Sequence, residues 1–279
     1  MIRLSAFADE ISPDLDEQLA VLEREQIAYL DLRGAWNTNV LDFSDEQVRT
    51  IQEKLAANNI QVAAIASPIG KTPIDRPFEE TLRQMERAVT LAHTFSTSYI
   101  RIFSFYPPTN GLESEIDLPM WHQEVVDRLR TLTAQAKEAG IILLHENEKD
   151  IYGATVVRCL DIMQSCEEPA LRMAFDPANF IQCGQTPFPD AYEVLRPWVE
   201  YVHVKDALPD GKVVVAGAGA GQWREFLRQL QADGYEGFLA LEPHLAAEGQ
   251  FGGFSGADLF HQAVHALKGL LEEMRWEYS

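Results

Sequence analysis

Short apolar runs rich in β-branched residues alternate along the whole chain with longer amphipathic stretches. Runs of this length, bounded by turn residues, predict β-strands. Expected strands are Ile2–Phe7, Ala28–Arg33, Ile60–Ala66, Ser98–Phe105, Gly140–Glu146, Arg172–Asp176, Glu200–Lys205 and Gly237–Glu242.

The stretches between these runs carry apolar residues at helical spacing. Ser12 is expected to cap the first helix, with Pro13 at its first position. Ser44 and Gln47 predict a capping box at the start of the next helix. Later helices are expected around Leu82–Ala92, Val125–Leu132, Val156–Met163, Ala191–Leu195, Trp223–Leu230 and Ala257–Met274, the last capped by Ser255.

Strand and helix alternate eight times, which predicts a parallel sheet covered by helices. Eight units favour a fold of class α/β, a single (β/α)8 TIM barrel, over an open doubly wound sheet. No linker, low-complexity tract or sequence repeat interrupts the 279 residues. We therefore expect one domain that spans residues 1–279.

Charge and composition exclude several classes of protein. The formal net charge is −20, and such an acidic surface repels nucleic acid. No apolar stretch reaches the roughly 20 residues of a membrane span, and the first residues do not resemble a secretion signal. We expect a cytoplasmic protein with no membrane or nucleic-acid partner, and leave open whether it forms a homo-oligomer. The 3 cysteines have no CxxC spacing, which argues against disulfides and a thiolate zinc site.

Four consecutive expected strands end in residues that commonly bind metals: Glu146, Asp176, His203 and Glu242. In TIM barrels, functional side chains gather at the C-terminal ends of the strands. Alone, a Glu or Asp after a strand is more often a helix cap or a solvated charge, and a His in a strand is more often a core residue. Together, three carboxylates and one imidazole predict a site for one divalent metal ion, namely Mn2+, Mg2+, Co2+, Fe2+ or Zn2+.

Strand alternation adds neighbours to this site. Lys205 shares a face with His203, and His244 shares a face with Glu242, so both are candidates for substrate binding. Arg33 lies at the end of the second expected strand.

Arg33 has two interpretations that the sequence leaves open. It binds a substrate hydroxyl or carboxylate, or it joins a structural cluster inside the barrel with Asp31, Arg101 or Arg172.

The strand-end segments resemble those of the xylose isomerase-like barrel superfamily. They are ENE at 146–148, FDPANF at 175–180, HVKD at 203–206 and LEP at 241–243, with ADEIS near the start and SPIGK at 67–71. The likeness runs nearly end to end and is greatest for the sugar phosphate isomerase/epimerase branch, which includes ketose 3-epimerases, hydroxypyruvate isomerase and inosose dehydratases.

This resemblance implies that Glu146, Asp176, His203 and Glu242 are the metal ligands. It also implies that Glu146 and Glu242 are catalytic and move protons on opposite faces of a sugar, through an enediolate that the metal stabilises.

The surroundings of the metal depart from the family pattern. Asn179 stands where the ketose epimerases have a histidine, and Pro209 stands where they have an arginine. Glu148 is the candidate for the acidic residue that they use after the first ligand. Asn179 and Glu148 are therefore candidate substrate-binding residues.

We therefore predict a metal-dependent sugar isomerase or epimerase acting on a ketose or a related small polyhydroxy carbonyl compound. One alternative is an inosose dehydratase-like lyase on the same metal core, with Lys205 or His244 as the acid. Another is a non-catalytic carbohydrate-binding barrel. The abasic-site endonuclease group of the superfamily is disfavoured, because the third and fourth strands end in Ser67 and Ser104 instead of histidines and the chain is strongly acidic.

Two glycine-rich segments bear on whether the substrate carries a phosphate. GAGAG at 217–221 and GGFSG at 252–256 lie where barrel enzymes commonly bind phosphate. Neither contains a basic side chain, which favours a role in shaping turns. A phosphorylated and a neutral sugar-like substrate both stay open.

Overall fold

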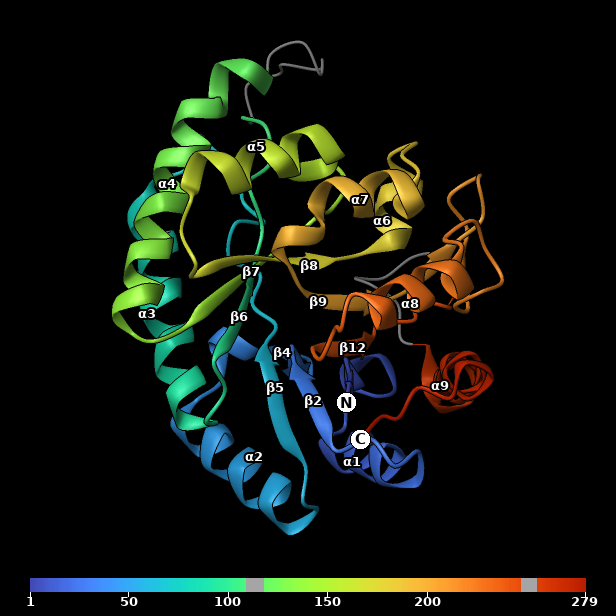
Figure 1. Ribbon diagram of the computed structural model, residues 1–279. Helices are drawn as coiled ribbons and strands as arrows, with labels where there is room; N and C mark the ends of the chain where they lie inside the picture. Colours follow the sequence, from blue (N-terminus) through green and yellow to red (C-terminus); the bar gives the residue numbers. More distant parts are fainter. Residues whose placement is uncertain (109–117, 247–254) are drawn as a thin grey trace.

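The computed structural model describes residues 1–108, 118–246 and 255–279. Eight parallel strands close into a barrel in the order β1-β12-β9-β8-β7-β6-β5-β2, which confirms the TIM barrel and excludes the open sheet (Figure 1). The strands are β1 (Arg3–Ala6), β2 (Tyr29–Leu32), β5 (Gln61–Ile65), β6 (Tyr99–Ile102), β7 (Ile142–Glu146), β8 (Leu171–Phe175), β9 (Val199–Val204) and β12 (Phe238–Leu241).

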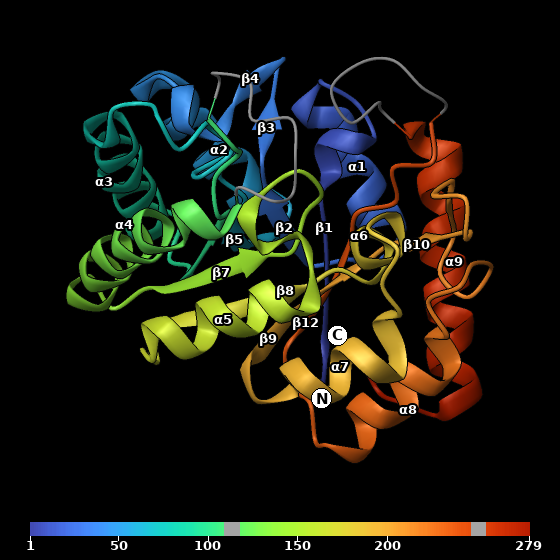
Figure 2. The ribbon, with the colours of Figure 1, turned by 90° about the horizontal axis from the view of Figure 1, so that it is seen from above.

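Helices follow the strands and cover the outside of the barrel (Figure 2). They are α1 (Leu15–Arg24), α2 (Asp45–Ala57), α3 (Phe78–Thr94), α4 (Leu118–Glu138), α5 (Val156–Cys166), α6 (Pro177–Gln182), α7 (Tyr192–Leu195), α8 (Trp223–Ala232) and α9 (Gly256–Met274). Helix α6 was not expected from the apolar pattern, because it is too short to show helical periodicity. Its signal is the pair Asp176-Pro177, a cap followed by proline at the first helical position.

Apolar side chains form two separate layers. The larger fills the space between the strands and the helices, and it includes the fully buried Phe226 and Leu4. A smaller cluster fills the inside of the barrel, where Tyr201 stacks on Phe238 with 5.2 Å between the ring centroids. This inner layer also holds polar groups, because the hydroxyl of Tyr201 hydrogen-bonds to Asp31 and Ser5.

Helix capping differs from expectation at two of three positions. The Ser44–Gln47 capping box is present in full. Ser12 is not a cap: Asp14 takes that place and accepts hydrogen bonds from the backbone of Asp16 and Glu17. Ser255 precedes α9 but makes no capping bond.

The hydroxyl of Ser255 is used elsewhere. It donates to Glu10 and accepts a hydrogen bond from the backbone N–H of Leu245. Two short hairpins extend the mouth of the barrel, β3 (Gly34–Ala35) with β4 (Thr38–Asn39), and β10 (Asp206–Ala207) with β11 (Val213–Val214).

Two expectations from composition concern membranes and cysteines. In the part of the chain that the structure describes, no helix is both long and apolar enough to cross a bilayer. Cys159, Cys166 and Cys183 are all free thiols.

Replacing Ser44 by Ala removes one half of the capping box, so we expect the free energy of unfolding to fall by about 1 kcal/mol. Urea denaturation followed by circular dichroism measures it. The control is Glu53→Ala, an exposed position of the same helix. Equal stability of the two variants would show that the box contributes nothing.

Candidate metal centre

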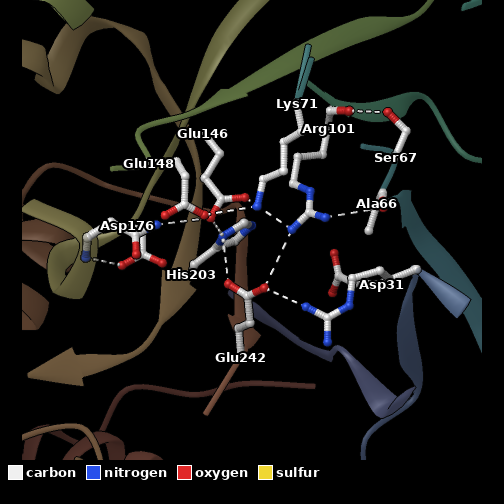
Figure 3. Close-up of polar contacts among 12 residues, drawn as sticks. Asp31, Ala66, Ser67, Lys71, Arg101, Glu146, Glu148, Asp176, His203 and Glu242 are labelled. Atoms are coloured by element: carbon white, nitrogen blue, oxygen red, sulfur yellow. Dashed lines mark hydrogen bonds and ion pairs between the residues drawn. The ribbon is translucent and has the colours of Figure 1, made fainter. Parts of the chain in front are cut away.

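The structure brings Glu146, Asp176, His203 and Glu242 to one point inside the barrel mouth (Figure 3). One ligand atom from each lies within 4.8 Å of the ligand atoms of the other three. Their exposed fractions are 1%, 0%, 1% and 2%. Four side chains that are far apart in the sequence therefore share a single buried position.

Strand register explains this convergence. Glu146 is paired with Ala174, two residues before Asp176, and His203 is paired with Ala240, two residues before Glu242. Residues two apart in a strand point to the same face, so all four side chains point into the barrel. The stagger between neighbouring barrel strands brings them to a similar height.

Three buried carboxylates would repel each other strongly without nearby cations. Lys205 Nζ lies 2.8 Å from Asp176 Oδ2. Arg101 Nη1 lies 3.1 Å from Glu146 Oε2 and 3.5 Å from Glu242 Oε1. Cations from opposite sides of the barrel thus stabilise the carboxylates in their ionised form.

The carboxylates differ in their pKa values. Burial alone would raise the pKa of Glu146, but the charges of His203 and Arg101 outweigh it and hold that pKa at about 2. Burial raises the pKa of Asp176 to about 6, although Lys205 opposes the shift. Burial opposes the charged forms of Glu242 and Lys205. The charge of Lys205 nevertheless lowers the pKa of Glu242, and the charges of Asp176 and Glu242 raise the pKa of Lys205.

The donor atoms fit a divalent cation. His203 Nδ1 and Asp176 Oδ2 are buried, and neither makes a well-directed hydrogen bond among the described residues, although Asp176 Oδ2 forms the ion pair with Lys205. His203 Nδ1 faces Glu146 Oε1 at 3.3 Å and Glu242 Oε2 at 3.5 Å. Buried polar atoms rarely lack partners, and a metal ion coordinated by these atoms would supply one.

Two asparagines hold the ligands in place. Asn147 accepts a hydrogen bond from the backbone N–H of Asp176 and donates to its carbonyl, both at 2.9 Å. Asn179 donates from its backbone to Asp176 Oδ1 at 2.9 Å and from its side chain to Glu146 Oε1 at 3.2 Å. Asn147 was not singled out from the sequence, although it is the central residue of the ENE segment.

A cavity of about 870 Å3 opens above this cluster. It is large enough for a small sugar-like molecule. Every residue proposed from the sequence to bind substrate lines it, together with the catalytic candidate Glu242: Arg33, Glu148, Asn179, Lys205 and His244.

Arg33 has acidic partners other than the one considered from the sequence. Its guanidinium contacts Asp9 Oδ2 at 2.7 Å and Glu242 Oε1 at 2.9 Å. The expected partner Asp31 instead accepts a hydrogen bond from the hydroxyl of Tyr201 at 2.7 Å. Arg33 still lines the cavity, with 19% of its side chain exposed.

Arg101 and Arg172, the other two arginines considered for a cluster with Arg33, have different surroundings. Arg101 contacts the same carboxylate of Glu242 that Arg33 contacts. The guanidinium of Arg172 instead donates a hydrogen bond to the backbone carbonyl of Leu171.

His244 is held by Glu10, which the sequence reasoning missed. His244 Nε2 lies 2.8 Å from Glu10 Oε1 and 3.5 Å from Glu242 Oε1. Burial would lower the pKa of His244, but the charges of Glu10 and Glu242 raise it to about 9. Glu10 is completely buried, and its only sequence signal is its place in the ADEIS segment.

Glu148 lines the cavity, with 16% of its side chain exposed. Its carboxylate pairs with Lys71 Nζ at 3.0 Å, and Lys71 also lies 4.3 Å from the centre of the Phe103 ring. Lys71 belongs to the SPIGK segment and was not proposed as a site residue. Lys71 and Glu148 both line the cavity, and Figure 3 shows their ion pair.

The aromatic residues near the mouth have separate roles. Phe105 is buried in the core, Tyr106 lines the cavity, and Trp36 and Trp121 pack against the core. At the ends of the third and fourth barrel strands, Ser67 and Ser104 hydrogen-bond to backbone groups.

The segment at 217–221 is occupied by a carboxylate of the protein itself. Asp206 accepts hydrogen bonds from the backbone N–H groups of Gly217, Gly219 and Gly221 at 2.9–3.0 Å. A Cβ at Gly219 would lie 2.5 Å from Asp206 Oδ1. The glycines therefore shape this turn, and the N–H groups that a phosphate would need are used. Of the second segment, 252–254 lies outside the described residues.

The family profile described as xylose isomerase-like TIM barrel matches residues 27–275. A 3-dehydroshikimate dehydratase of Bacillus anthracis is 22% identical over 175 residues, which cover 61% of this chain and 60% of that protein. A 2-epi-5-epi-valiolone 7-phosphate 2-epimerase of Actinoplanes sp. is 31% identical over 104 residues, 37% of each chain. The chain thus spans less than two thirds of the length of these two curated relatives.

Among solved structures, the IOLI protein, crystallised with a bound zinc atom, superposes with a TM-score of 0.75. The match covers 98% of this chain and 99% of that one at 17% identity. At 17% identity, this likeness shows that the two chains share a fold, and nothing beyond the fold.

Replacing Asp206 by Ala leaves backbone N–H groups without a charged acceptor, so we expect the free energy of unfolding to fall by about 3 kcal/mol or more. Urea denaturation checks this. Asp210→Ala, in the exposed turn of the same hairpin, is the matched control. A loss no larger than that of the control would contradict the role given to Asp206.

Proposed function

Because this chain belongs to the xylose isomerase-like TIM barrel family, we propose that it is a divalent-metal-dependent sugar isomerase or epimerase. The proposed substrate is a ketose or a related small polyhydroxy carbonyl compound. The observation that carries the proposal is the convergence of three carboxylates and one imidazole at the base of a cavity.

Glu146, Asp176, His203 and Glu242 would hold the metal ion. Mn2+, Mg2+ and Co2+ suit a site dominated by carboxylates, and the zinc atom bound by the structurally similar IOLI protein adds Zn2+ to this set. When bound, the ion would polarise a substrate carbonyl and make the adjacent C–H bond more acidic.

Glu146 and Glu242 would carry the proton transfer. One carboxylate removes the proton from the carbon beside the carbonyl. The other acts in its protonated form, with a proton taken from solvent, and donates it to the opposite face or to the neighbouring carbon. The low pKa of these acids keeps the carboxylate that removes the proton ionised at neutral pH. Asn179 holds Glu146, and Arg33 holds Glu242, so both are fixed in orientation.

Cations around the cavity would orient the substrate. Lys205 and His244 line it beside Glu242, and Lys71 lines it as well. Their N–H groups can donate hydrogen bonds to hydroxyl or carbonyl oxygens of a sugar. The backbone N–H groups at 217, 219 and 221 are already bonded to Asp206, so they are not available to bind a phosphate group.

A dehydratase on the same core is the second candidate. It is supported by the aligned 3-dehydroshikimate dehydratase and by the contact between His244 and the buried Glu10, which would orient the ring as a proton donor to a departing hydroxyl. The two functions differ in their product: an epimerase conserves the substrate mass, whereas a dehydratase removes one water.

Replacing Glu242 by Gln should reduce turnover by about 100-fold or more, because the amide can neither accept the proton nor match the charge of its partners. The assay incubates ketoses, inososes and hydroxypyruvate with Mn2+ in deuterium oxide and follows label uptake and water loss by NMR.

The matched control is Glu277→Gln, which changes the same functional group at an exposed position. Normal turnover of Glu242→Gln on a true substrate would rule out the two-carboxylate mechanism. Loss of water without epimerisation would select the dehydratase.

Replacing Asn147 by Ala should weaken Mn2+ binding by about 10- to 100-fold, because Asp176 loses the groups that orient it. Titration with Mn2+, followed by electron paramagnetic resonance, measures the affinity. Gln231→Ala, on the exposed face of α8, serves as the control. Unchanged affinity in Asn147→Ala would mean that Asp176 needs no such support.

A further inference from the structure

A second group of metal-binding side chains lies on the outside of the barrel. Glu25 follows the last residue of α1, and His261 and His265 lie on α9. One ligand atom from each lies within 4.8 Å of the others. Helices α1 and α9 lie side by side in both views of the ribbon (Figures 1 and 2).

The spacing of the two histidines places them on one face of α9. Residues four apart in a helix lie one turn above each other, and these two imidazole rings are 4.1 Å apart between centroids. His261 Nδ1 lies 2.9 Å from Glu25 Oε1, and His265 Nε2 lies 3.9 Å from Glu25 Oε2. Both histidine nitrogens thus face the same carboxylate.

These separations are close to those of a tetrahedral zinc site. Ligand atoms about 2.0–2.1 Å from zinc are about 3.4 Å from each other. The His265 side chain is 64% exposed and the His261 side chain is 48% exposed, so both can move the small distance that coordination requires.

Burial and a backbone hydrogen bond fix Glu25 beside the two histidines. Its side chain is only 4% exposed, and Lys268 Nζ hydrogen-bonds to its backbone carbonyl. Burial opposes ionisation, but His261 and Arg24 lower the pKa of Glu25, so the carboxylate is available as a ligand. Arg24 is 56% exposed and can turn toward solvent when a cation takes its place beside Glu25.

We propose that Glu25, His261 and His265 form a second metal site, for one zinc-class ion (Zn2+, Ni2+ or Cu2+), with water at the remaining position. Two imidazoles and one carboxylate favour these ions over Mn2+ and Mg2+, which prefer oxygen ligands. The site is separate from the centre in the barrel mouth and does not depend on the proposed enzymatic function.

The position of this site gives it a structural role. Helix α1 follows the first barrel strand, α9 follows the last, and these two strands, β1 and β12, pair where the barrel closes. The three ligands meet only when α9 is helical and the barrel is closed. An ion bound there therefore favours the folded chain over the unfolded one.

Zinc counting tests the proposal. Four proteins are compared: wild type, the double variant His261→Gln/His265→Gln, Glu25→Gln and the control His93→Gln. Each is loaded with Zn2+ and passed through a desalting column, and the zinc per chain is then measured by mass spectrometry. His93 is an exposed histidine on α3. Circular dichroism verifies that each variant is folded.

We expect the double histidine variant to carry one zinc ion fewer per chain than wild type, and Glu25→Gln to retain less zinc than His93→Gln. Loading with Mn2+ should give the same count in all four proteins. Equal zinc counts in wild type and the double variant would overturn the proposal, and so would an equal loss in His93→Gln. Because the two histidines are exposed, the double variant decides the outcome even if Glu25→Gln fails to fold.

Discussion

The mouth of this barrel depends on the balance of charge around three carboxylates that water barely reaches. Glu146, Asp176 and Glu242 are at most 2% exposed and share one position. Buried like charges are strongly unfavourable unless cations and hydrogen bonds compensate them. The compensating groups come from separate parts of the barrel: Arg33 follows β2, Arg101 lies in β6, and Lys205 follows β9. A cation among the four ligands would complete this balance.

The same contacts join the ends of the chain. Glu242 follows the last barrel strand, and its carboxylate contacts Arg33 from the second unit. His244 contacts Glu10, which follows the first strand. The residues that hold the site thus also link the first and last units across the closure of the barrel. The proposed zinc site on α1 and α9 would strengthen this closure from the outside.

The sequence predicted features that depend on local order. The ends of the last four strands, the side chains that line the cavity and the Ser44 capping box all follow from strand period, strand order and helix chemistry. The first capping position was wrong because Ser12 and Asp14 are both good caps, and only the backbone geometry selects Asp14.

Contacts between distant segments could not be predicted in this way. The partners of Arg33 are 24 and 209 positions away, and nothing in the local pattern distinguishes them from Asp31. Asn147 and Asp206 hydrogen-bond to backbone groups. Because every residue has such groups, the sequence does not show which of them these side chains will contact. The order of the strands therefore predicts where the site lies. The hydrogen bonds that support the site can be identified only from the three-dimensional structure.

Crystals soaked in Mn2+, with diffraction recorded at a wavelength where manganese scatters anomalously, test the central claim most directly. We expect one strong anomalous peak in the barrel mouth, within about 2.4 Å of oxygen or nitrogen atoms from all four strand-end residues. A fully soaked crystal with no peak there, or with a peak that fewer than three of these side chains touch, would contradict the central claim.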